Sequence, residues 1–120
     1  MNDWDAIYSY SRKQAIEDGI LIDCTEMAKE AGLKYPTAIT RGLWDGFISN
    51  DDEFLYDTKG KLWDVLMVLR IEARNAKGNE VHFKVLFQKN NGKEKVDLWA
   101  VIDGGDDGQP VMTILLEGED

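Results

Sequence analysis

Apolar residues recur at three- and four-residue steps through most of the first two thirds of the chain, which predicts a series of helices. Ser11 followed by Gln14 has the spacing of a capping box, and Gly19 suits the position just after a helix C-terminus. The first helix is therefore expected within residues 11–19. The apolar run at residues 20–23 is expected to be extended.

Two more helices are predicted between this run and residue 48. Asp23 or Thr25 can cap the second helix, which should end at Gly32. Pro36 suits the first position of the third helix, because that position needs no backbone N–H. The third helix is expected to reach about residue 48, since an apolar stripe continues through Ile39, Leu43, Trp44 and Phe47.

The fourth predicted helix starts close to Lys59 and stops at Gly78. Its apolar band is wide enough for a helix that is largely buried. The band consists of Leu62, Trp63, Val65, Leu66, Met67, Leu69, Ile71 and Ala73.

Beyond Gly78 the apolar period changes to alternation, which predicts strands. Three alternating runs lie within residues 79–117, and Asn91-Gly92 is a strong signal for a two-residue hairpin turn between the first two. Short turns favour an antiparallel meander. The predicted fold class is α+β, with about four N-terminal helices followed by a three-stranded antiparallel sheet packed on the fourth helix.

A length of 120 residues predicts a single domain. Residues 1–10 are expected to form an N-terminal tail, residues 11–77 the helical part and residues 79–117 the sheet. The only cysteine, Cys24, cannot form an internal disulfide, and the sequence shows neither a signal peptide nor a membrane-spanning run. A cytoplasmic location without a membrane partner is therefore predicted.

The charge of the chain is strongly negative and unevenly distributed. The formal net charge is −9, with −7 in residues 1–57, +5 in residues 58–95 and −7 in residues 96–120. Binding to nucleic acid is not expected, because most of the surface would repel phosphate. A protein partner with a basic surface would be attracted, and homo-oligomerisation stays open.

Residues 25–47 nevertheless allow an alternative, because two short helices joined at Gly32 are typical of a DNA-binding helix-turn-helix. Because the segment has so few cations, its binding to DNA would release few counterions and would gain little affinity from that release. A helix-turn-helix regulator is therefore the second hypothesis. Its DNA-binding residues would be Lys34, Thr37, Thr40 and Arg41.

Residue types that catalyse reactions or bind metals are sparse. Cys24 and His82 are the only thiol and imidazole, and nothing in the sequence ties them together, although a helix N-terminus would lower the pKa of Cys24. The aspartates of the turn with Asp103, Asp106 and Asp107 lack calcium-loop spacing and are expected to accept backbone N–H bonds. No zinc ligand set or nucleotide-binding motif is present. The chain is therefore predicted to be no enzyme and to have no catalytic residue, metal or cofactor; an enzyme using Cys24 or the acidic turn is the third hypothesis.

Two of the four tryptophans are candidates for partner binding. Trp99 alternates opposite the apolar face of its predicted strand, and Trp4 lies in the expected tail. An exposed tryptophan beside acidic residues is a plausible anchor for a protein partner. The predicted partner-binding residues are Trp4, Trp99, Asp103, Asp106 and Asp107.

Three sequence blocks, "YSRKQAIEDGILIDCTEMAKEAGLKYPTAIT", "GKLWDVLMVLRIEARN" and "DGGDDGQPVMTILLEGED", are spread over nearly the whole chain. Together they resemble a family of small uncharacterised proteins encoded on bacterial plasmids, conjugative elements and phages. The resemblance implies an accessory role on a mobile element, with no assigned activity. With the charge pattern, it favours a non-enzymatic acidic accessory protein that acts by protein–protein binding. Inhibition of a nucleic-acid-handling host protein is one form that this binding would take.

Overall fold

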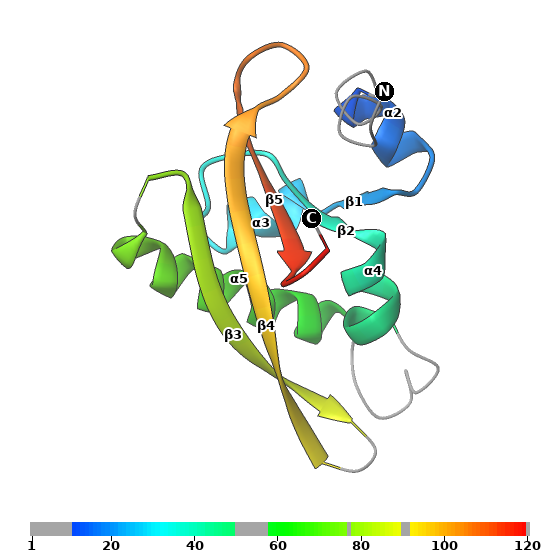
Figure 1. The fold of residues 1–120 in the computed structure, drawn as a ribbon, viewed down its shortest axis with the longest axis vertical. Coiled ribbons are helices and arrows are strands. Elements are labelled where there is room, and N and C mark those ends of the chain that lie inside the picture. Colours follow the sequence, from blue (N-terminus) through cyan, green and yellow to red (C-terminus); the bar gives the residue numbers. More distant parts are fainter. Residues whose placement is uncertain (1–10, 50–57, 77, 90–91, 120) are drawn as a thin grey trace.

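The computed structural model describes residues 11–49, 58–76, 78–89 and 92–119. Within these residues, five strands form one mixed sheet in the order β1-β2-β5-β4-β3 (Figure 1). Strand β2 is parallel to β5, and the other neighbouring pairs are antiparallel. The strands are β1 Leu21–Asp23, β2 Thr37–Thr40, β3 Glu80–Lys89, β4 Gly92–Gly104 and β5 Pro110–Leu116.

The described helices are short apart from one. They are α2 Arg12–Glu17, α3 Thr25–Glu30, α4 Arg41–Leu43, a π-helix Trp44–Ile48, α5 Thr58–Glu72 and a 3-10 turn Ala73–Asn75. None of the helices in the described part of the chain is long and apolar enough to cross a membrane.

The helix signals at both ends of α2 are confirmed. The Ser11 hydroxyl accepts a hydrogen bond from the backbone N–H of Gln14 at 3.0 Å. Gly19 and Gly32, which follow α2 and α3, have φ of +78° and +95°, where a side chain would be strained. Helix α5 starts close to the predicted residue, but it ends at Glu72 rather than at Gly78.

The prediction of a three-stranded antiparallel sheet after four N-terminal helices is wrong, although the fold is α+β. Strands β3, β4 and β5 do form an antiparallel meander. Strand β5 then continues the sheet into β2, which comes from the predicted third helix, and on into β1, which lies within residues 20–23, the run expected to be extended. The predicted turn at Asn91-Gly92 is wrong, because Gly92 already belongs to β4 and pairs with Lys89. The predicted tail at 1–10, which contains Trp4, lies outside the described residues.

The predicted third helix over residues 36–48 is also wrong, because its first part is strand β2. Residues Thr37, Ile39 and Thr40 are β-branched, which favours a strand. Since β2 is buried on both faces, it lacks the alternation that marks a half-exposed strand. The Thr40 hydroxyl accepts the backbone N–H of Leu43 at 3.2 Å, so the helix starts later than expected, at Arg41.

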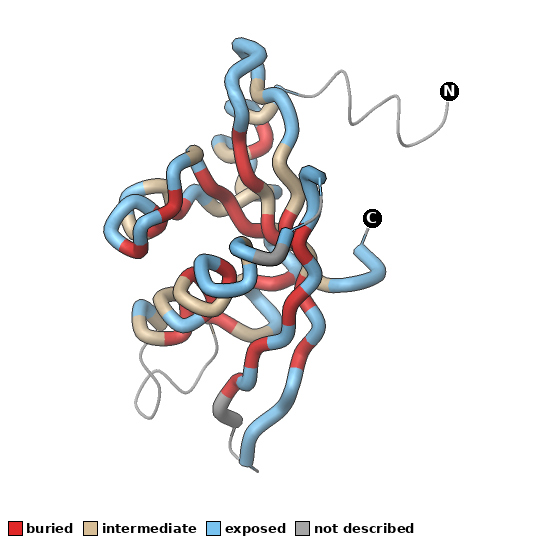
Figure 2. Tube along the Cα trace, turned by 90° about the vertical axis from the view of Figure 1, so that its left-hand side faces the viewer, coloured by how far each residue is buried: buried red, intermediate tan, exposed pale blue. Residues whose placement is uncertain are grey.

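One face of the sheet, here called the inner face, is covered by helices. A row of apolar side chains crosses all five strands on this face, with Ile39 and Ile114 at its centre, fully buried. Figure 2 shows the helices on one side of the strands, and α5 packs on β3. The row consists of Ile22, Ile39, Ile114, Ala100 and Val81, and the residues of α5 buried against the core include Leu62, Val65, Leu66 and Leu69.

The opposite face, here called the outer face, is only partly covered. Helix α2 lies beside the β4–β5 turn at one end of the sheet, where Arg12 bonds to β5. Within the described part of the chain, no helix lies in front of β3 and the adjoining length of β4 (Figure 1). His82 and Lys84 on β3 are accordingly exposed. The outer face of these two strands is therefore the surface that the fold leaves available.

A substitution at Ala38 distinguishes strand β2 from the predicted helix. In the structure Ala38 is fully buried, so Ala38→Leu should lower the free energy of unfolding by about 1–3 kcal/mol through overpacking. In a helix over residues 36–48 this position would lie opposite the apolar stripe, and leucine would be tolerated. Urea denaturation measures the difference, and Ala76→Leu at an exposed position is the matched control, expected within about 0.5 kcal/mol of the original chain. A stability of Ala38→Leu equal to that of the control would contradict strand β2.

Candidate functional site

Strands β3 and β4 bring a group of polar and aromatic side chains together on the outer face. Alternation along β3 puts His82 and Lys84 on this face, and the register places them opposite Trp99 and Asp97 of β4. Glu117 follows β5 and adds a carboxylate beside them. We call this group the outer-face cluster; it consists of Glu80, His82, Lys84, Asp97, Trp99 and Glu117.

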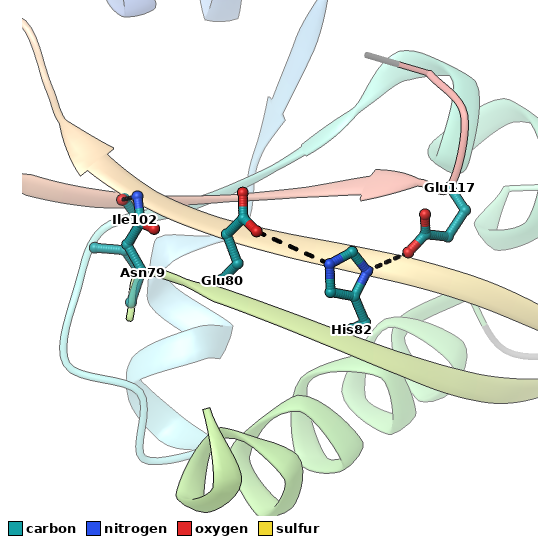
Figure 3. Close-up of polar contacts among 5 residues, drawn as sticks. All are labelled: Asn79, Glu80, His82, Ile102 and Glu117. Atoms are coloured by element: carbon teal, nitrogen blue, oxygen red, sulfur yellow. Dashed lines mark hydrogen bonds and ion pairs between the residues drawn. The ribbon is translucent and has the colours of Figure 1, made fainter. Parts of the chain in front are cut away.

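The imidazole of His82 lies between two carboxylates (Figure 3). Its Nδ1 contacts Oε1 of Glu117, and its Nε2 lies 4.0 Å from Oε2 of Glu80. Because an ionised carboxylate only accepts hydrogen bonds, the contact with Glu117 requires a proton on Nδ1. Glu117 therefore fixes both the orientation of the ring and the position of one of its protons.

Trp99 is the cross-strand neighbour of His82, and its ring stacks on the imidazole. The two rings are stacked, with 5.8 Å between their centroids and 6° between their planes. The indole Nε1 of Trp99 is buried and has no hydrogen-bond partner among the described residues. Trp99 was predicted as a partner-binding residue, and the structure places it on the open part of the sheet.

The charges of the outer-face cluster are mixed, with an excess of acid. Lys84 Nζ lies 3.2 Å from Asp97 Oδ1, and both side chains are exposed. This pair is neutral overall, which leaves the carboxylates of Glu80 and Glu117 facing a single imidazole. The outer-face cluster therefore combines aromatic area with net negative charge, a combination that attracts an ammonium or guanidinium group, while the exposed Lys95, opposite Leu86, adds a cation at its margin.

Two carboxylates and one imidazole meet in the outer-face cluster. Among the residues that the structure describes, no group of three or more His, Cys, Asp or Glu side chains is arranged to hold a metal ion. The contacts of His82 are with two carboxylates and an indole.

Two of the three predicted acidic residues of the β4–β5 turn bind backbone groups of this chain. The carboxylate of Asp106 accepts the backbone N–H groups of Arg12 at 2.8 Å and Lys13 at 3.0 Å, at the start of α2. These bonds lower the pKa of Asp106 from its ordinary value of 3.8. Asp107 accepts the backbone N–H of Gln109 at 3.0 Å. Backbone bonding by these aspartates was the expected role of such a turn.

The side chain of Arg12 occupies the end of the outer face nearest this turn. Its guanidinium donates to the hydroxyl of Thr113 and to the carbonyl of Met112, each at 2.7 Å. Burial lowers the pKa of Arg12, while the negative charges of Asp103 and Asp23 act in the opposite direction. Asp103 therefore faces a cation of its own chain, and it does not join Trp99 in one cluster.

The residues of the helix-turn-helix hypothesis do not lie along one helix. Thr37 is fully buried in β2, and its hydroxyl donates to the carbonyl of Tyr35. The hydroxyl of Thr40 donates to Glu119, and Arg41 forms an ion pair with Asp45 at 3.0 Å. Lys34 is exposed, in the segment between α3 and β2. These residues consequently present no recognition helix to DNA.

The only thiol and the only imidazole are held at opposite edges of the sheet. Cys24 directly follows β1 at one edge, and His82 lies on β3 at the other. Cys24 is buried in the core cluster, and burial raises the pKa of its thiol to about 12. The expectation that a helix N-terminus would lower this pKa is wrong, because desolvation outweighs the short helix α3.

Sequence reasoning missed Arg12, Glu80 and Glu117. Glu80 could have been found, because it alternates in phase with His82 along the predicted strand. Arg12 and Glu117 meet their partners across 101 and 35 residues of sequence, so no local pattern marks them.

The chain belongs to the family of unknown function DUF6573, which matches it over residues 1–120. No curated protein and no solved structure matches the chain.

The pKa of Asp106 predicts how stability depends on pH. A carboxylate with a lower pKa in the folded than in the unfolded chain stabilises the fold above its ordinary value of 3.8, and this contribution disappears as the pH falls through the folded value. Asp106→Asn should therefore be less stable than the original chain at pH 7, with a difference that shrinks toward zero in acid. Denaturation at a series of pH values from about 7 to about 2.5 measures it. A constant difference over that range would show that the carboxylate charge has no role.

The position of Cys24 predicts an unreactive thiol. Because the side chain is 6% exposed and its pKa is raised to about 12, a thiol-specific disulfide reagent at about pH 8 should label the unfolded protein rapidly and the folded protein very slowly. Absorbance of the released thiolate, with and without guanidinium chloride, measures both rates. Rapid labelling of the folded protein would contradict this prediction. It would place Cys24 in an accessible, reactive position, as an enzyme that uses Cys24 would require.

Proposed function

We propose that this protein is a non-catalytic binding domain that takes a positively charged segment of a protein partner on the outer-face cluster. The observation that carries the proposal is the uncovered face of β3 and β4, where Trp99 lies among the carboxylates of Glu80, Asp97 and Glu117. Aromatic and charged side chains on one open face are typical of the centre of a protein interface.

A guanidinium group already occupies the other end of the same face. Arg12 lies there against β5, with its two terminal nitrogens bonded to Thr113 and Met112 and with Asp23 and Asp103 nearby. The sheet thus accommodates one arginine within the chain by hydrogen bonds and surrounding carboxylates. An arginine or lysine of a partner could likewise contact the carboxylates and the indole ring of the outer-face cluster.

The resemblance to proteins of plasmids, conjugative elements and phages extends this proposal. We infer an accessory protein of a bacterial mobile element that works in the cytoplasm. A basic protein surface that normally holds nucleic acid would be a suitable partner, because the net charge of −9 competes with phosphate for it. Inhibition of a nucleic-acid-handling host protein would follow from that competition.

A labelled peptide of alternating arginine and serine tests the proposal through fluorescence anisotropy. Glu117→Lys should weaken binding about fivefold, since the loss of a partly exposed charge contact is worth about 1 kcal/mol. Binding of the original chain should also weaken as salt is added.

Glu26→Lys is the matched control, because it makes the same charge change at an exposed position on α3, outside the outer-face cluster. Equal weakening by the two variants would show that the peptide senses only the net charge, and it would contradict a defined site. Tighter binding of labelled double-stranded DNA than of the peptide would contradict the proposed partner class.

A further inference from the structure

Strand β3 is the last strand at one edge of the sheet in the described part of the chain. The residue before β3 shows which backbone groups of the strand hydrogen-bond to β4. The carbonyl of Asn79 accepts the backbone N–H of Ile102 at 2.9 Å (both residues appear in Figure 3). In an antiparallel pair such bonded positions recur at every second residue. Val81 and Phe83 therefore bond to β4, while the backbone groups of the even-numbered residues of β3 point away from β4.

This edge is long and open to pairing. Strand β3 has 10 residues and contains no proline, and side chains facing the helices are apolar and buried. On the outer face, Glu80, His82, Lys84 and Leu86 are all exposed, and Leu86 is 55% exposed despite its size. Among the described residues no other strand pairs with this edge, and a row of open N–H and C=O groups on a strand of this length is a template for another strand.

We propose that a second copy of this chain pairs antiparallel with β3, edge to edge, about a two-fold axis at His82. The partner strand completes the hydrogen bonds of the even-numbered residues, and the two sheets join into one continuous sheet. The interaction is isologous, because the same residues of both copies form it. It does not depend on the proposed function, although Glu80, His82 and Lys84 belong both to this edge and to the outer-face cluster.

The charges on β3 select this register. Only even-numbered residues have free edge groups, so they must lie opposite one another in a self-paired edge. With the axis at His82, Glu80 of each copy lies opposite Lys84 of the other, and both cross-strand pairs are attractive. With the axis at Lys84, two lysines would lie directly opposite each other, which is unfavourable.

Helix α5 provides further contact surface for the second copy. In Figure 1 the last turns of α5 extend past the edge of β3, behind the plane of the sheet. A strand added at this edge would lie over that part of the helix.

Charge reversal at the two paired positions tests the proposal by sedimentation velocity. The original chain should show a concentration-dependent dimer. Glu80→Lys and Lys84→Glu should each weaken it by about tenfold or more, because each makes both cross-strand pairs repulsive. An equimolar mixture of the two variants should recover the dimer, because each cross-strand pair between the two variants again joins a lysine to a glutamate.

The matched control is the pair Glu26→Lys and Lys29→Glu on exposed positions of α3, which carry the same charge changes. These two variants should dimerise like the original chain, alone and mixed. A chain that stays monomeric at millimolar concentration would overturn the proposal. Single β3 variants that dimerise normally, or a mixture of them that stays monomeric, would overturn it as well.

The register has its own test by oxidative cross-linking. His82→Cys should form a disulfide with its own copy, because residues on the axis of an antiparallel pair face each other within disulfide range. Leu86→Cys, two positions beyond the paired residues, should not cross-link at the same concentration. Preferred cross-linking of Leu86→Cys would overturn the register and the charge pairing that selects it. These experiments measure dimerisation and not peptide binding, so their failure is distinguishable from failure of the proposed binding function.

Discussion

The parallel pairing of β2 with β5 holds the two halves of this fold together. Ile39 and Ile114 lie opposite each other at the centre of the sheet, and both are fully buried. Through this pair the short N-terminal elements join the C-terminal meander, and the inner face becomes five strands wide. A face of that width must be covered by apolar helix surface, so α3 and α5 are committed to it. Among the described helices, none is then available to cover the outer face of β3 and the adjoining length of β4, which stays open.

The sequence was sufficient for the elements whose signals are local. The cap at Ser11, the glycines after α2 and α3, the start of α5 and the alternation of β3 to β5 all follow from neighbouring residues. Strand β2 could not be found in the same way. It is a buried strand of four residues, and its Ile39 continues into Leu43 at a spacing that also suits a helix. Only its partner β5, far away in the chain, decides between the two structures.

The candidate site shows the same division between local and distant information. Alternation correctly places His82 and Trp99 away from the core. Their neighbours depend on register: a turn at Asn91-Gly92 would put His82 opposite Val101, whereas the observed pairing of Lys89 with Gly92 puts it opposite Trp99. A shift of two residues keeps each side chain on its face but changes what it touches. The contact with Glu117 needs the third strand as well, and it could not be derived from the sequence.

The central claim is that the sheet has one sealed face and one face that stays open over β3 and β4. Nuclear magnetic resonance with a soluble gadolinium chelate tests it most directly, because the chelate speeds relaxation of protons that it can approach. The account predicts strong relaxation of side-chain signals of His82 and Glu117 and very weak relaxation of the methyl groups of Ile39 and Ile114. Strong relaxation at Ile39 would contradict the buried strand β2, and shielding of His82 in a monomeric sample would contradict the open face.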